Sequence, residues 1–466
     1  MRKVDVAIIG AGHAGLNALK EVRRAGCSWV LIDNGSIGTT GEGVGCVPSK
    51  TIIELARQRW SSGGTGGTGG TGGMGGMGRK GVRADGPALR ERVLGLRDNF
   101  ADEMLGNSAA DMTEGQELLR GQARFVETNL LEVNGERIRA GRIVVATGSL
   151  YAVPGRWRNL GDCLLTPDSL FDLEHLPASV VVVGLGPTGL ELGQALSRLG
   201  VVVSGFDASA NIAAISDPFV NKIAVQTISR EFLLHLGEEV DVESDSFGVY
   251  VKSAKRVKAT KRLLVATGRV SNLPEGLSGL CETDERGVPI FNARTLQVGD
   301  LPVFIAGDAT GDRMTLQDAA EEGRVAGANA AREKPFPLAR KVPMTIVFSD
   351  PNIAQVGARL DEVPDAVVGQ TRFGPVGRTL MMARNRGVIR LYAQRGSGRL
   401  LGACMVGPRV EHLAHLVAWS VQQGHTVQYM QQMPFYHPVI EEALEGALKD
   451  TAHRVLAAGI PEADAA

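Results

Sequence analysis

The feature that most constrains the fold is a strand, glycine turn and helix pattern that occurs twice. A continuous apolar run at residues 4–9 leads into "GAGHAG", and a second run at residues 179–183 leads into "GLGPTG". Each turn is followed by a helical pattern. A buried parallel strand that passes through a tight glycine turn into a helix is typical of a dinucleotide-binding βαβ unit. The chain is therefore predicted to be an α/β protein with two such units.

The residues within these units indicate the chemistry. Both turns have the GxGxxG spacing, which lets a pyrophosphate approach the backbone at a helix N-terminus, where free N–H groups and the helix dipole stabilise its charge. An acidic residue closes the next strand of each unit, where it can accept a hydrogen bond from a ribose hydroxyl. The predicted binding residues are Gly10, Gly12, Gly15 and Asp33 in the first unit and Gly184, Gly186, Gly189 and Asp207 in the second.

The segment after Asp207 favours NAD over NADP. It reads "ASANI" and offers no arginine for a 2′-phosphate. Pro187 departs from a purely glycine or small-residue turn, and it is expected to influence where the second helix starts.

Length and charge exclude several classes of function. A chain of 466 residues with 44% hydrophobic residues is expected to form two to four domains. Fifty basic and 51 acidic residues leave a net charge of −1, so neither nucleic acid nor an anionic membrane is an expected partner. The first apolar run ends at Gly10 and is too short for a signal peptide or a membrane span, so we expect a cytoplasmic protein.

The potential metal ligands do not form a metal site. His412 and His415 lie three residues apart on a predicted helix, but no third ligand is near, so we expect packed interface histidines and no metal. The cysteines lack any CxxC or zinc spacing, which indicates neither a disulfide framework nor a zinc site and fits a reducing compartment. They are Cys27, Cys46, Cys163, Cys281 and Cys404.

Two segments interrupt the repeating pattern. Residues 61–78 are a tandem GGT/GGM tract with almost no apolar surface, which predicts a flexible surface loop. From Lys341 the glycine turns give way to the strand patterns "MTIVFSD" and "GVIRLYAQ", and amphipathic helices follow from Glu411. This change predicts a separate α+β domain at the C-terminus.

Further motifs complete a resemblance to a known family. The segments "RIVVATGS" and "LLVATGR" end in the same Ala-Thr-Gly, "VFIAGDAT" ends a strand at Gly307-Asp308, and "VGCVPSK" and "FYHPVIEE" stand near the two ends of the chain. Together they resemble the pyridine nucleotide–disulfide oxidoreductase family, and within it the dihydrolipoamide dehydrogenase group. The resemblance covers nearly all of the chain except the glycine tract.

The resemblance implies a domain order and two cofactors. Residues 1–150 and 272–335 would form the FAD-binding domain, 151–271 the NAD-binding domain, and 336–466 the dimerisation domain. FAD would occupy the first glycine turn and NAD the second. The further cofactor-binding residues that it implies are Thr147, Gly148, Gly268, Arg269, Gly307 and Asp308.

The resemblance also implies catalytic residues. Lys50 would lie beside the flavin and pair with Glu191. From the sequence alone, without the resemblance, Lys50 could also be a solvated lysine and Glu191 a carboxylate stabilised near a helix N-terminus. His437 would be a general base oriented by Glu442, a role that suits a group with a pKa near neutrality. In the family this histidine reaches the flavin site of the other subunit, which implies a homodimer.

The stretch "GTTGEGVGCVPSK" departs from the family pattern. Cys46 matches the inner, flavin-side thiol of a redox-active disulfide, but the outer thiol position holds Gly41. Four explanations stay open: a disabled disulfide step, an enzyme that uses one cysteine, a flavoprotein that reduces non-thiol acceptors, and a non-catalytic FAD-binding partner. A soluble transhydrogenase is disfavoured, because Cys46 is retained and the second turn lacks an NADP-type arginine.

The sequence therefore predicts a homodimeric FAD- and NAD(H)-linked oxidoreductase. Its expected substrate is at the thiol/disulfide level, either a lipoyl-type disulfide, a mixed disulfide or a persulfide, and would react through Cys46. The alternatives are a quinone or dye reductase in which Cys46 is a spectator, and a non-catalytic FAD-binding subunit.

Overall fold

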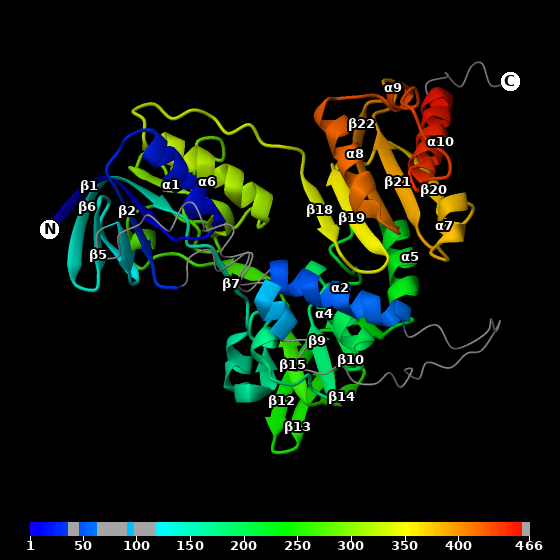
Figure 1. Cartoon of the computed structure of the whole chain (residues 1–466), viewed down its shortest axis with the longest axis horizontal. Coiled ribbons are helices and arrows are strands. Elements are labelled where there is room, and N and C mark those ends of the chain that lie inside the picture. Colours follow the sequence, from blue (N-terminus) through cyan, green and yellow to red (C-terminus); the bar gives the residue numbers. More distant parts are fainter. Residues whose placement is uncertain (36–45, 63–90, 97–116, 459–466) are drawn as a thin grey trace. The chain divides into compact units, whose positions relative to one another are not determined.

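A computed structural model describes residues 1–35, 46–62, 91–96 and 117–458 (Figure 1). Gly41 and the glycine tract beyond Ser62 lie outside the described residues. The chain divides into two compact units. Unit 1 comprises Met1–Thr51, Pro87–Ala152 and Gly268–Arg340, and unit 2 comprises Ile52–Gly86, Val153–Thr267 and Lys341–Ala466.

Unit 1 is built on a mainly parallel sheet that begins with the predicted first strand. Its strands follow the order β3-β2-β1-β6-β5-β4, and β17 pairs with the C-terminal half of β6. β1 pairs in parallel with β2 and β6, and β5 pairs antiparallel with β4 and β6. The strands are β1 (Arg2–Ile9), β2 (Trp29–Asp33), β3 (Leu118–Arg120), β4 (Ala123–Glu127), β5 (Leu130–Val133), β6 (Glu136–Val145) and β17 (Val303–Ile305).

Helices α1 (His13–Arg24) and α6 (Leu316–Ala330) pack side by side in unit 1 (Figure 1). Glycine permits their close approach. A Cβ atom on Gly323 would lie 2.1 Å from the carbonyl oxygen of Ala14, and one on Gly327 would lie 2.3 Å from that of Ala18. A short antiparallel pair, β7 (Ser149–Tyr151) with β16 (Arg269–Ser271), and the 3-10 turns Leu277–Gly279 and Gly307–Thr310 complete the unit.

Unit 2 contains a second parallel sheet, with the order β11-β10-β9-β15-β8. Helix α4 (Pro187–Arg198) has Pro187 in its first turn, where the missing N–H of proline costs nothing. An antiparallel β-meander, β12-β13-β14, follows β11. The other elements are β8 (Leu164–Leu165), β9 (Ser179–Val183), β10 (Val202–Asp207), β11 (Leu233–Leu236), β12 (Val240–Asp245), β13 (Gly248–Ser253), β14 (Val257–Thr260), β15 (Arg262–Val265), α5 (Pro218–Ile228) and the 3-10 segments Gly155–Cys163 and Ser169–Asp172.

The C-terminal part of unit 2 is an antiparallel sheet packed against helices. The strand order is β18-β19-β22-β21-β20, with α8 against β19 and β22 and α10 against β20 and β21. Apolar residues of the sheet and of both helices form one core cluster, as the predicted α+β pattern requires. The elements are β18 (Met344–Val347), β19 (Asn352–Gly357), β20 (Val367–Arg372), β21 (Val388–Ala393), β22 (Leu400–Gly407), α7 (Gly377–Met381), α8 (Val410–Gln422), α9 (Val427–Met430), α10 (Glu442–Ala458) and the 3-10 turn Leu360–Glu362.

The unit boundaries differ in two ways from the predicted domains. Helix α2 (Cys46–Ser62) runs across a boundary, because its residues from Ile52 onward group with unit 2 and not with the first domain. Residues 153–267 and 341–466 group as one unit, whereas the sequence predicts two domains there. Among the described helices, none has the length and apolar character required to cross a bilayer.

Candidate active site and nucleotide-binding turns

The first glycine turn is shaped by contact with the strand beside it. Gly10 has a φ of +103°, and a Cβ there would lie 2.2 Å from the carbonyl oxygen of Ala146. A Cβ on Gly15 would lie 1.8 Å from the carbonyl oxygen of Gly10. Gly12 is different, because a Cβ there would meet nothing within 4 Å. The space over Gly12, at the N-terminus of α1, can therefore admit a ligand.

Asp33 holds the same turn from the neighbouring strand. Its Oδ2 accepts a hydrogen bond from the backbone N–H of Ala11 at 2.6 Å, and its Oδ1 accepts one from that of Gly35 at 2.7 Å. A groove lined by Gly10, Asp33, Thr147 and Asn272, among others, opens beside it. A carboxylate has more lone pairs than these two bonds use, so Asp33 can also accept from a ribose hydroxyl.

The second glycine turn repeats this geometry in unit 2. Gly184 has a φ of +92°, and a Cβ there would lie 2.3 Å from the carbonyl oxygen of Ala266. A Cβ on Gly189 would lie 1.9 Å from the carbonyl oxygen of Gly184, while one on Gly186 would meet nothing within 4 Å. Asp207 accepts from the backbone N–H groups of Leu185 at 2.6 Å and Ser209 at 2.7 Å. Both turns thus fit a dinucleotide by the same arrangement.

The two Ala-Thr-Gly segments have the same structural place in the two units. Ala146 N donates to Ile9 O and Ala266 N donates to Val183 O, each at 2.8 Å, so each segment continues the strand next to its glycine turn. Gly148 and Gly268 both have positive φ, at +71° and +113°. The repeated Ala-Thr-Gly motif therefore packs against the glycine turn in the same way in both places.

A polar cluster in unit 1 surrounds Asp308. The hydroxyl of Ser149 donates to Asp308 Oδ2 at 2.6 Å, and Arg269 Nε donates to the same hydroxyl at 2.7 Å while lying 3.5 Å from Asp308 Oδ2. The backbone N–H of Gly307 donates to the buried carboxylate of Glu322 at 2.8 Å. The structure thus brings together the predicted residues Asp308 and Arg269. Ser149 and Glu322 were missed, although Ser149 directly follows an Ala-Thr-Gly motif.

Burial and a cation act in opposite directions on Glu322. Burial raises the pKa of its carboxyl group above the usual value, and the guanidinium of Arg340, 2.5 Å away, counteracts the rise. The carboxylate fixes the backbone next to Asp308, so we assign it a structural role.

His437 and Glu442 form a hydrogen-bonded pair in unit 2. The Nδ1 of His437 lies 2.7 Å from Glu442 Oε1, and the backbone N–H of Val439 donates to Glu442 Oε2 at 3.1 Å. The hydrogen bond with His437 holds the pKa of the Glu442 carboxyl below its usual value. A carboxylate accepts this bond, so Nδ1 carries the proton and Nε2 is the basic nitrogen. The His437 side chain is 78% exposed in the single chain.

Glu191 is buried on α4, with 3% of its surface exposed, and its Oε1 accepts from the backbone N–H of Phe348 at 2.7 Å. Lys50 is half-buried on α2, one helical turn after Cys46, the first residue of that helix. Gly41 lies outside the described residues. The structure therefore places Cys46 and Lys50 on one helix and reveals Phe348 as a partner of Glu191.

An apolar groove lies beside the His437 segment. Its volume is about 490 Å³, and it is lined by residues of α8 and of the segment around His437, including Trp419, Tyr436 and Val439. Trp419 is 64% exposed and Tyr436 is 81% exposed in the single chain. Large aromatic side chains exposed together typically mark an interaction surface. His412, predicted to be a packed interface histidine, has a side chain that is 70% exposed here.

The fold and these sites define a class of protein. Two dinucleotide-binding units and a C-terminal α+β domain with a His–Glu pair are the parts of a two-dinucleotide oxidoreductase. A family model described as pyridine nucleotide-disulphide oxidoreductase matches residues 4–323, and one described as the dimerisation domain of that family matches residues 343–448. The chain belongs to the pyridine nucleotide-disulphide oxidoreductase family.

Family membership confirms the predicted class. Members of the family are FAD- and NAD(P)-dependent oxidoreductases, and the chain is an enzyme of that kind. The match to the dimerisation domain supports a homodimer.

Individual relatives resemble the chain along most of its length. It is 28% identical to a dihydrolipoyl dehydrogenase of Halobacterium salinarum, with 97% of each chain covered. It is 26% identical to a mercuric reductase of Staphylococcus aureus, over 91% of this chain and 78% of the relative.

Solved structures share the fold. The HOCl-induced flavoprotein disulfide reductase RclA from Escherichia coli, as its Cu(II) complex, superimposes with a TM-score of 0.81 at 21% identity, covering 96% of this chain and 99% of that one. LpdA from Mycobacterium tuberculosis superimposes with a TM-score of 0.80 at 22% identity and the same coverage.

Proposed function

We propose that the chain is an NADH-linked flavoprotein that reduces a disulfide-level substrate, namely a lipoyl-type disulfide, a mixed disulfide or a persulfide, through the single cysteine Cys46. The observation that carries this proposal is the His437–Glu442 pair, with Nδ1 and Oε1 2.7 Å apart and the histidine exposed. An incoming thiol or a leaving thiolate needs a proton acceptor or donor even when the enzyme supplies only one sulfur. The presence of this pair in a chain whose outer thiol position holds glycine favours a one-cysteine reaction.

The chemistry would run through a mixed disulfide. His437 would first take the proton of the Cys46 thiol at Nε2. The Cys46 thiolate would then attack one sulfur of the substrate RSSR′, so that a Cys46–S–S–R bond forms and the substrate S–S bond breaks, and the departing R′S⁻ would take that proton back from His437. FAD, held by the first glycine turn and Asp33, would supply the two electrons from NADH that return the mixed disulfide to the Cys46 thiolate and RSH. The sum is NADH + H⁺ + RSSR′ giving NAD⁺ + RSH + R′SH.

The other groups have supporting parts in the proposal. The first turn with Asp33 would hold FAD, together with Thr147, Gly148, Gly307 and Asp308, and the second turn with Asp207 would hold NAD. Gly268 and Arg269 are kept as proposed cofactor-binding residues, and Arg269 contacts the same cluster as Asp308. The absence of arginine in residues 208–212 supports NAD over NADP. Lys50 and Glu191 would act beside the flavin, where a cation stabilises negative charge in a reduced centre.

The proposal includes a homodimer in which His437 of one subunit serves Cys46 of the other. The dimerisation-domain match and the apolar groove beside His437 both support it. A second copy would cover the exposed rings of Trp419 and Tyr436, since apolar residues are enriched at obligate interfaces.

The test is an anaerobic titration of the purified holoenzyme with NADH, followed by addition of lipoamide, mixed disulfides, persulfides and quinones in separate assays. We expect turnover of at least one sulfur substrate, and we expect Cys46→Ser to abolish it while NADH still bleaches the flavin. Cys27→Ser, in a half-buried cysteine of unit 1, is the matched control and keeps wild-type turnover.

Two outcomes would redirect the assignment. Flavin bleaching with quinone turnover but no sulfur-substrate turnover would make the chain a quinone or dye reductase with Cys46 as a spectator. Bound flavin that NADH does not reduce would make it a non-catalytic FAD-binding subunit.

A further inference from the structure

The face of α4 that carries Glu191 continues into two more buried polar residues. Gln194 and Arg198 follow three and seven residues later, which places all three on one side of the helix. Gln194 is 3% exposed and the Arg198 side chain 5% exposed. Burying an amide and a guanidinium is costly unless each is well hydrogen-bonded, so their partners decide whether this face is stable.

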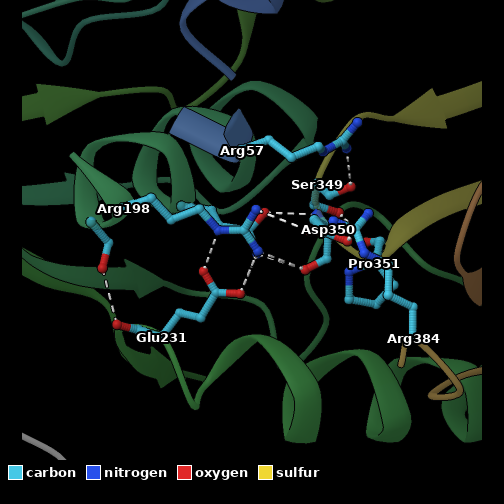
Figure 2. A network of polar contacts seen from close by, with 9 residues as sticks. Arg57, Arg198, Glu231, Ser349, Asp350, Pro351 and Arg384 are labelled. Atoms are coloured by element: carbon cyan, nitrogen blue, oxygen red, sulfur yellow. Dashed lines mark hydrogen bonds and ion pairs between the residues drawn. The ribbon is translucent and has the colours of Figure 1, made fainter. Parts of the chain in front are cut away.

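Their partners lie in the loop between β18 and β19. The backbone N–H of Asp350 donates to Gln194 Oε1 and Gln194 Nε2 donates to Asp350 O, each at 2.8 Å. Arg198 Nη1 donates to Asp350 Oδ2 at 3.0 Å (Figure 2). Two residues earlier, Phe348 N donates to Glu191. Helix α4 and the loop are thus joined by a row of hydrogen bonds that runs from Glu191 to Arg198.

Arg198 is fixed from a second side by Glu231. Arg198 Nε and Nη2 donate to the two carboxylate oxygens of Glu231, each at 2.7 Å, in a bidentate arrangement (Figure 2). Burial alone would lower the pKa of the guanidinium, but the hydrogen bonds and charges of Glu231 and Asp350 outweigh it and raise the pKa. Arg198 is therefore a permanent cation held between two carboxylates.

Helix α2 joins the same cluster. Arg57 Nη2 donates to Ser349 O at 3.4 Å, and the Arg198 guanidinium lies 5.5 Å from the centre of the Trp60 ring (Figure 2 shows Arg57 and Ser349). α2 is the helix that begins at Cys46 and carries Lys50. One arginine therefore contacts both the helix of the proposed redox cysteine and the loop that binds Glu191.

We propose that Arg198 is a positioning residue for the redox centre. It anchors Asp350, which places the Phe348 N–H that orients the Glu191 carboxylate, and it packs on Trp60 of the helix that begins at Cys46. The inference rests on the proposed function in one respect, namely that Glu191 acts beside the flavin. A purely structural ion pair would stabilise unit 2 without affecting Glu191.

The test compares Arg198→Lys, Glu191→Gln and the double variant as holoenzymes. Lysine keeps the charge but loses the bidentate geometry and the planar packing, so any effect reports position and not charge. Asp350→Asn is a second variant that weakens the same anchor if Arg198→Lys folds poorly. Arg390→Met is the matched control, because Arg390 forms another buried ion pair in unit 2, at 2.6 Å from Asp217.

The first measurement is amide hydrogen exchange at Phe348 and Asp350. Loss of one hydrogen bond to a charged group is expected to accelerate exchange about tenfold in Arg198→Lys.

The second measurement is the midpoint potential of the bound flavin. Arg198→Lys is expected to shift it in the same direction as Glu191→Gln, and the double variant no further, because both act through one carboxylate. Arg390→Met is expected to lower thermal stability but leave both readouts at wild-type values.

Three results would overturn the proposal: a wild-type potential in Arg198→Lys and Asp350→Asn, additive shifts in the double variant, or no shift in Glu191→Gln, which would leave nothing for Arg198 to position. Failure of the proposed function is a separate result, since sulfur-substrate turnover by the wild type is measured independently of potential and exchange.

Discussion

At the scale of single residues, the proposed function uses His437 and Glu442 together as one base. In this proposal Glu442 accepts from the Nδ1 proton and leaves Nε2 to exchange protons with sulfur. We expect His437→Gln to lower kcat with the sulfur substrate by roughly 10²- to 10⁴-fold, and Glu442→Gln to lower it less, because the imidazole remains. The measurement is steady-state turnover alongside quinone reduction, which both variants keep.

The control for this pair is His175→Gln, which changes an exposed histidine of unit 2 that precedes the C-terminal α+β part. It is expected to retain full turnover. Equal losses of sulfur and quinone turnover in His437→Gln would argue against its role as a base for sulfur.

Asp207 determines the preferred nucleotide in this account. Its carboxylate would repel a 2′-phosphate and accept from a free ribose hydroxyl, so we expect kcat/KM for NADH to exceed that for NADPH by roughly 10- to 100-fold. Asp207→Ser combined with Ala208→Arg is expected to reverse much of this preference. A wild-type enzyme that uses NADPH equally well would contradict the assignment.

Single residues also show what the sequence can and cannot reveal. Asp33 and Asp207 were predicted because each closes a strand about twenty residues after its glycine turn, a local pattern. The contact of Glu191 with Phe348 spans 157 positions and uses a backbone N–H, which has no sequence signature. Arg198 gave a partial signal, since it lies on the helical face of Glu191, but its partners Glu231 and Asp350 follow only from the fold.

At the scale of elements, each glycine turn contains one glycine that close packing requires and one that faces open space. Gly189→Ala places a Cβ 1.9 Å from the carbonyl oxygen of Gly184, so we expect a loss of about 1–3 kcal/mol in the free energy of unfolding. The Cβ of Gly186→Val would meet nothing within 4 Å, so we expect this variant to lose less stability than Gly189→Ala. Its side chain would instead occupy the space of the pyrophosphate and raise the Kd for NADH.

Thermal unfolding and NADH titration of both variants check this prediction. Unchanged NADH affinity in Gly186→Val would show that the open space over α4 does not receive the nucleotide. The same pair of changes at Gly15 and Gly12 provides an internal comparison for FAD, because the first turn has the same geometry.

The sequence predicted the elements better than their arrangement. Both strand–turn–helix units and the C-terminal strands follow from local periodicity and glycine spacing. Ala146 packs against Gly10 because of a strand pairing that spans more than a hundred residues. The repeated Ala-Thr-Gly motif can be seen in the sequence, but its position beside the glycine turn cannot be predicted from it. The grouping of α2 from Ile52 onward with unit 2 likewise depends on contacts with residues far along the chain, such as Ser349.

At the scale of the whole molecule, the account requires two chains. His437 is exposed in the single chain and lies beside a groove lined by Trp419 and Tyr436, and the chain carries the dimerisation domain of its family. A composite site would explain why the proposed base lies on an exposed surface of the single chain. It also makes the activity depend on which chain supplies each residue.

The most direct test of this account mixes two inactive homodimers, Cys46→Ser and His437→Gln, under conditions that allow subunit exchange. About half of the resulting dimers are hybrids, and each has one site that combines intact Cys46 with intact His437 from the other chain. We expect sulfur-substrate turnover to recover to about a quarter of the wild-type rate. No recovery, despite hybrids detected by native mass spectrometry, would contradict a single-cysteine site completed by the second subunit.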